Sequence, residues 1–106
     1  MGLWLTEGGE GVIRLEACGS GLCGTIVGTS NAAQCRLTIM NMTPTPDGTW
    51  SGHITDPSNG SVWNARLRLD ERDRLLLRGY VVVPLLGATQ VWTRYTGRLT
   101  PDCRMV

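Results

Sequence analysis

The 106-residue sequence contains no lysine and no phenylalanine, and it has a single histidine. Ten arginines against nine acidic residues give a formal net charge of +1. This balance argues against a strongly basic nucleic-acid-binding protein and against an acidic tail. Because every basic residue is arginine, we read the bias as genomic composition, with a dedicated arginine site for anions as the minor alternative.

Long apolar runs are absent as well. The longest stretch, residues 80–87, is interrupted by Pro84 and falls well short of the roughly 20 residues of a membrane span. We expect no signal peptide within this sequence, because Met1 opens directly on Gly-Leu-Trp-Leu. Four cysteines in so small a domain favour an oxidising compartment. We therefore expect a periplasmic or secreted protein from which a leader has been removed, and a cytosolic protein is the alternative.

No segment shows a convincing helical period, whereas strand signals recur along the chain between turn residues. Residues 62–69 alternate most cleanly, with Trp63, Ala65, Leu67 and Leu69 on one face and polar side chains on the other. Such alternation indicates a sheet with one dry and one wet face. Residues 43–48, with two prolines, are expected to form a loop. The expected strands cover residues 3–6, 11–18, 22–28, 36–41, 49–55, 62–69, 74–83 and 89–98, with a connector at 84–88.

About eight strands at hairpin spacing, without a helix to cover a sheet, predict an all-β fold. An up-and-down antiparallel barrel removes the exposed edges that an open sheet would have, and eight strands are a common closing number. A β-sandwich is the alternative. We expect one domain over residues 1–106, with a peripheral tail at residues 99–106.

Cys18 and Cys23 flank a glycine-rich turn between two strand-like runs. This arrangement predicts a β-hairpin closed by a disulfide. Cys35 and Cys103 do not provide a second short-spaced pair, so a zinc site is not expected. They either form a second disulfide, if the tail folds back, or remain free thiols.

Several short motifs occur in an order and spacing that resemble a known family. They are Gly2-Leu-Trp4, the Cys18-to-Gly24 turn, Asp56-Pro57 with Gly60, and residues 89–94. Together they resemble the small exported bacterial proteins known as domain of unknown function 2147, over residues 2–95. The resemblance implies an envelope-associated protein with a lipocalin-like barrel, and it implies no established activity. Relatives often have cysteines near the positions of Tyr80 and Gly87, which this chain lacks.

The first and last motifs are also similar to a pattern of the calycin superfamily. In that pattern a tryptophan on the first strand packs near an arginine on the last strand. Trp4 and Arg94 match these positions. The resemblance implies that they close one barrel end through a cation–π contact, worth roughly 0.5–2 kcal/mol.

Candidate catalytic groups are few. A cysteine nucleophile needs a base, and His53 could serve only Cys35, without local support for that pair. His53 lies on the strand face opposite Trp50 and Ile54. If these apolar residues point into the barrel, His53 lies on its outside. If the register is reversed, His53 points into the cavity, where it could ligate haem iron or sense pH. Glycine-rich stretches lack a phosphate-loop pattern. We expect no enzyme, no metal and no cofactor.

The tryptophans are large enough to form much of the core, and some could line a ligand-binding mouth. Arg78 and Tyr80 share a strand face, as do Trp92 and Arg94, so cations lie beside aromatic rings. We read these pairs as external salt bridging and barrel closure, and a cavity for an anionic amphiphile is the minor alternative. The residues expected to contact a ligand are Trp50, Trp63, Arg78, Tyr80 and Trp92.

The sequence therefore predicts an exported, non-enzymatic barrel. It would bind one small apolar or amphiphilic ligand or an envelope partner, and it would bind no nucleic acid. The alternative is a structural or protein-interaction module with a solid core.

Overall fold

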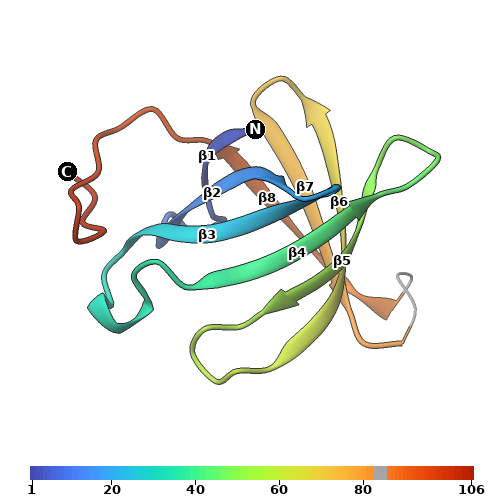
Figure 1. Cartoon of the computed structure of the whole chain (residues 1–106), viewed down its shortest axis with the longest axis horizontal. Helices are drawn as coiled ribbons and strands as arrows, with labels where there is room; N and C mark the ends of the chain where they lie inside the picture. The colour runs from blue at the N-terminus through green and yellow to red at the C-terminus, as the bar shows by residue number, and fades with distance from the viewer. Residues whose placement is uncertain (83–85) are drawn as a thin grey trace.

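A computed structural model describes residues 1–82 and 86–106, and its eight antiparallel strands close into one barrel (Figure 1). Each strand pairs with its sequence neighbour, and β1 also pairs with β8. The expected all-β, up-and-down barrel is therefore confirmed, rather than the sandwich. The strands are β1 (Gly2–Leu5), β2 (Gly11–Cys18), β3 (Gly21–Thr29), β4 (Thr38–Pro44), β5 (Trp50–Thr55), β6 (Val62–Glu71), β7 (Arg74–Tyr80) and β8 (Ala88–Arg94).

The position of β4 corrects one expectation. The strand was expected at residues 36–41 with a proline loop after it, but it begins at Thr38 and continues through Pro44. Pro44 is the last residue of the strand, opposite Trp50, where its missing N–H does not interrupt the ladder. At the other end, Arg36 has a φ of 68°, a left-handed conformation that cannot continue a strand.

Two further strands end earlier than expected. β7 ends at Tyr80, and the expected residue 83, like residues 84–85 of the connector, lies outside the described residues. β8 ends at Arg94 rather than at residue 98. Within the expected polar loop before β4, a short 3-10 helix, η1 (Ala32–Gln34), is capped by the Asn31 side chain. No helix in the described part of the chain is long and apolar enough to span a membrane.

Alternating side chains of the strands fill the barrel. On β6, Ala65 and Leu67 are fully buried, whereas Leu69 is 48% exposed where the strand emerges from the core. Trp50 and Ile54 of β5 pack against the same core. The core residues are Trp4, Ile13, Leu15, Leu22, Ile26, Ile39, Met40, Met42, Ala65, Leu67, Leu75, Leu77 and Trp92.

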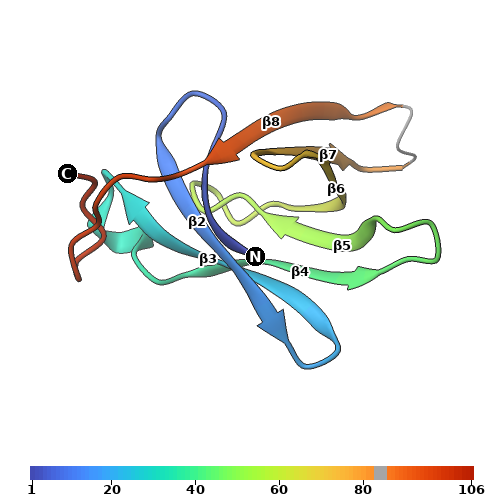
Figure 2. The ribbon, with the colours of Figure 1, turned by 90° about the horizontal axis from the view of Figure 1, so that it is seen from above.

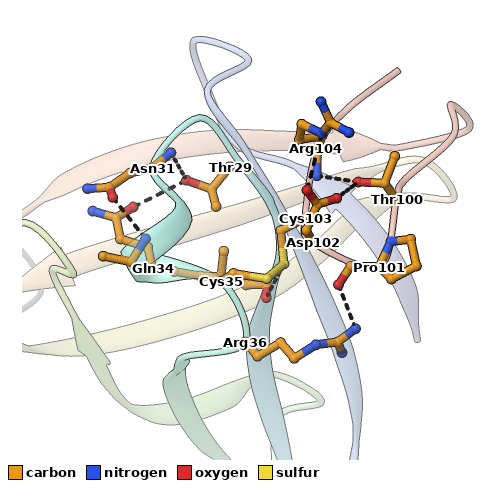
Figure 3. Close-up of a disulfide and its surroundings, with 12 residues drawn as sticks. Thr29, Asn31, Gln34, Cys35, Arg36, Thr100, Pro101, Asp102, Cys103 and Arg104 are labelled. Carbon is orange, nitrogen blue, oxygen red and sulfur yellow. Dashed lines mark hydrogen bonds and ion pairs between the residues drawn. A yellow bond between two sulfur atoms is a disulfide. The ribbon is translucent and has the colours of Figure 1, made fainter.

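The C-terminal segment, residues 95–106, packs outside the barrel beside β3 and the connection to β4 (Figures 1 and 2). A disulfide joins Cys103 to Cys35 (Figure 3). The Thr29 backbone N–H donates to the Cys103 carbonyl at 2.8 Å. Arg36 donates to the Pro101 carbonyl at 3.0 Å. The tail is therefore a fixed part of the fold.

Candidate functional site

One end of the barrel is closed by Trp4 and Arg94. The two residues are opposed in the β1–β8 ladder, and the guanidinium carbon lies 4.1 Å from the centre of the indole ring. Arg94 also donates to the carbonyl oxygens of Met1 at 2.9 Å and Arg72 at 2.8 Å, and its Nε lies 3.3 Å from an Asp73 carboxylate oxygen. One arginine thus connects the chain start, the β6–β7 turn and the last strand.

The opposite end contains a cavity of about 540 Å³ that opens to solvent. Its volume lies in the range of small-molecule sites. It is surrounded by the ends of β1, β3, β5 and β7 and the beginnings of β2, β4, β6 and β8. The lining residues are Thr6, Glu10, Gly11, Ile13, Ile26, Gly28, Thr29, Gln34, Ile39, Ile54, Thr55, Asp56, Pro57, Ser58, Trp63, Leu77, Gly79, Ala88, Gln90 and Trp92.

The floor of the cavity is apolar and its rim is polar. On the floor, Ile13, Ile26 and Trp92 belong to the buried core. At the rim, Glu10 is exposed and Asp56 is half-buried. This arrangement suits a ligand whose apolar part enters first and whose polar part remains near water.

The Asp56 side of the rim is fixed by a turn between β5 and β6. The Asp56 carboxylate accepts a hydrogen bond from the Ser58 backbone N–H at 2.8 Å, and its carbonyl accepts from Gly60 N–H at 2.8 Å. Gly60 has a φ of 77°, a conformation that favours glycine. The turn residues of the sequence therefore hold a carboxylate beside the opening.

On the β3–β4 side, η1 places Gln34 at the rim. The Asn31 side chain accepts a hydrogen bond from Ala33 N–H at 3.1 Å and so caps the short helix. Thr29 Oγ1 lies 3.4 Å from Gln34 Oε1. Because Cys35 follows directly and is bonded to Cys103, the disulfide lies next to this part of the rim.

Two of the five residues expected to contact a ligand line the cavity, namely Trp63 and Trp92. Trp63 is 41% exposed at the opening, and Trp92 donates from its indole N–H to Gln90 Oε1 at 3.1 Å. Trp50, Arg78 and Tyr80 are not among the lining residues.

The described lining residues include no arginine, so they offer no cation–aromatic pair for the anionic amphiphile of the minor alternative. Arg94 lies over Trp4 at the closed end. Arg78 follows the buried Leu77, so strand alternation directs it outward, where its Nη1 donates to Thr89 Oγ1 at 2.6 Å.

The sequence did not single out Glu10, Gln34 or Gln90 as site residues, and it gave Asp56 only a turn role. These residues lie in connections or at strand beginnings. In an up-and-down barrel every second connection emerges at the same end, so the connections after β1, β3, β5 and β7 share one mouth. The rim residues could therefore have been identified from the sequence by grouping every second connection of the expected barrel.

The cysteines and the histidine are not among the residues that line the cavity. Cys18 is bonded to Cys23, and Cys35 to Cys103, so the described residues include no free thiol. His53 is exposed on the outside of β5, as the alternation predicted. It borders a groove beside the Cys18–Cys23 disulfide, and this groove shares none of its described lining residues with the cavity.

The fold and its cavity define a small, closed, eight-stranded β-barrel with one sealed end and one open end. The chain belongs to the family described as uncharacterized proteins conserved in bacteria (DUF2147), whose model matches residues 2–94. The resemblance drawn from the sequence motifs is thereby confirmed. No curated protein and no solved structure matches the chain. The family match ends at the last residue of β8, so the tail and Cys103 lie beyond it.

Proposed function

We propose that this protein is an exported binding protein that holds one small apolar or amphiphilic ligand in its open cavity and releases it unchanged. The observation that carries this proposal is the cavity of about 540 Å³ with an apolar floor and a polar rim. An eight-stranded barrel has room for one small ligand when side chains do not fill its interior.

The hollow end favours ligand binding over a solid-core interaction module. In the closed half of the barrel, Leu15, Leu67 and Leu75 are fully buried and leave the interior filled. In the open half, Gly79 and Ala88 also line the interior, and they contribute little side-chain volume to it. A protein that used only its outer surface would gain stability by filling this space.

Binding without chemical conversion is supported by the composition of the lining. Its ionisable side chains are Glu10 and Asp56, and its other polar groups are hydroxyls, amides and backbone groups. The disulfides occupy the cysteines that could act as nucleophiles, and His53 lies outside the barrel. A binding role requires none of these groups to react.

Native mass spectrometry of gently purified protein tests ligand binding, both for a co-purified adduct and for a panel of fatty acids, alkylamines, alcohols and haem. Ala88→Trp should block the opening and abolish adducts. Ala17→Trp is the matched control, because Ala17 is exposed and lies outside the cavity lining. Failure of every probe to bind the unsubstituted protein would overturn the proposal.

Export is tested separately in a bacterium that encodes the protein. Two disulfides in 106 residues are typical of oxidising compartments. Cell fractionation with maleimide labelling should find the protein outside the cytoplasm with no reactive thiol. A cytoplasmic protein with four labelled cysteines would contradict the proposed location.

A further inference from the structure

The charge of the cavity lining identifies the kind of head group that a ligand would carry. Glu10 and Asp56 are the charged residues among the lining side chains, and both are acidic. Neither forms an ion pair among the described residues, whereas Asp70, Glu71 and Asp73 each have an arginine within 4.0 Å. The mouth therefore carries two carboxylates that no arginine neutralises directly.

A third carboxylate lies beside the same end. Glu7, in the connection between β1 and β2, accepts a hydrogen bond from the Val91 backbone N–H at 3.0 Å. Val91 lies between Gln90 and Trp92, which both line the cavity. This contact adds negative charge next to the opening without placing Glu7 in the lining.

Two arginines that lie close to lining residues in sequence are held away from the cavity. Arg36 follows the rim residue Gln34 by two positions, but its guanidinium donates to the Pro101 carbonyl in the tail (Figure 3). Arg78 precedes the lining residue Gly79, but it points outward and donates to Thr89. The cavity is acidic although the whole chain has a formal net charge of +1.

The tryptophans of the lining also favour a ligand with a positive charge. Trp63 and Trp92 present indole rings at the opening and on the floor, and an indole face attracts a cation within about 6 Å of its centre. We propose that the cavity selects amphiphiles with an apolar tail and a positively charged head group, such as a primary or quaternary alkylammonium ion.

In this arrangement the apolar tail of the ligand packs on the isoleucines and Trp92 of the floor. The cationic head group remains at the opening, which Glu10, Asp56 and Trp63 line. The inference rests on the proposed ligand-binding function and specifies its ligand class. It replaces the anionic amphiphile that was the minor alternative from the sequence, because Arg78 and Arg94 lie elsewhere in the structure.

The test uses three probes with the same eight-carbon tail: octyltrimethylammonium, 1-octanol and octyl sulfate. Dissociation constants are measured by calorimetry and by tryptophan fluorescence, below the concentrations at which the probes aggregate. The ammonium probe should bind about tenfold more tightly than the alcohol, because it gains two partly exposed charge contacts and one cation–π contact. The sulfate should bind most weakly, because the carboxylates repel it. The affinity of the ammonium probe should fall as salt concentration rises.

Variants that neutralise Glu10 or Asp56 test whether these two residues cause the preference for the ammonium probe. Glu10→Gln and Asp56→Asn should each weaken ammonium binding by about two- to fivefold and leave octanol binding unchanged. Asn can still accept the hydrogen bond from Ser58, so the turn is retained. Glu16→Gln is the matched control, because Glu16 is exposed on β2 outside the lining. Thermal unfolding verifies that each variant is folded.

The outcomes separate the two proposals. If octanol or octyl sulfate binds as tightly as the ammonium probe, the cationic preference is wrong while ligand binding stands. If the preference persists in the Glu10→Gln/Asp56→Asn double variant, its assignment to this rim is wrong. If no probe binds at any concentration tested, both this inference and the proposed function fail.

Discussion

The guanidinium carbon of Arg94 lies 4.1 Å from the centre of the Trp4 ring, and the same two residues form a pair in the ladder that closes the barrel. The contact therefore joins the first strand to the last. It also seals the end opposite the cavity, so the barrel has one fixed end and one accessible end.

Replacing Arg94 should destabilise the barrel more than replacing an exposed arginine. Arg94→Ala removes the cation–π contact and hydrogen bonds to Met1 and Arg72, so the free energy of unfolding should fall by about 2–3 kcal/mol. Arg94→Lys should have an intermediate effect, because lysine keeps the charge but lacks the planar fork. Urea unfolding measures both. The control Arg14→Ala, on the exposed face of β2, should change stability by less than about 0.5 kcal/mol.

The two disulfides should differ in their contribution to stability. Cys35 and Cys103 are 68 residues apart, whereas Cys18 and Cys23 are five apart. Chain entropy then predicts losses of about 4 kcal/mol for the Cys35→Ser/Cys103→Ser double variant and about 2 kcal/mol for the Cys18→Ser/Cys23→Ser double variant. Denaturant unfolding of both double variants tests the order. Equal losses would contradict the chain-entropy explanation.

Gly28 should be sensitive to a single added methyl group because the tail packs over it. A Cβ atom there would lie 2.9 Å from Leu99 Cδ2 and 2.9 Å from Val12 Cβ. Gly28→Ala should therefore cost about 1–3 kcal/mol. In Gly79→Ala the added atom would lie 4.0 Å from the Asn64 carbonyl oxygen, so that variant should be nearly neutral. Melting temperatures of the two variants provide the comparison, and equal shifts would contradict tail packing as the cause.

The turn between β4 and β5 should respond to acid. Hydrogen bonds from the Thr45 and Thr49 side chains lower the pKa of Asp47 from 3.8 to about 2. Because the folded pKa lies below the unfolded value, this stabilisation is present above about pH 4 and is lost as the pH falls through about 2. NMR titration of the Asp47 carboxyl carbon measures the midpoint. Thr45→Val should raise it towards 3.8, and an unchanged midpoint would contradict the assigned cause.

The barrel could be predicted because alternation along each strand determines which side chains face inward. Ala65 and Leu67 are fully buried and His53 is exposed, as the pattern required. The extension of β4 could not be predicted from propensity, since Pro44 is tolerated only because it ends the strand.

The cavity was less predictable than the barrel. Inward-facing residues such as Ile26 and Trp92 have the same pattern whether they fill the interior or border a hollow. Glu10 and Asp56 look like ordinary turn residues, and only the closed topology brings their connections to one mouth. The orientation of Arg78 and Arg94 then determined the sign of charge in the cavity.

The ladder between β1 and β8 consists of the pairs Trp4–Arg94 and Leu5–Thr93, and it is the shortest ladder among the eight described strands of the barrel. If it opened, two strand edges would become available for pairing with another molecule. The Cys35–Cys103 bond ties the segment after β8 to the connection between β3 and β4. A transiently opened barrel therefore keeps its last strand near its partners, which restricts strand exchange between molecules and the growth of edge-to-edge aggregates.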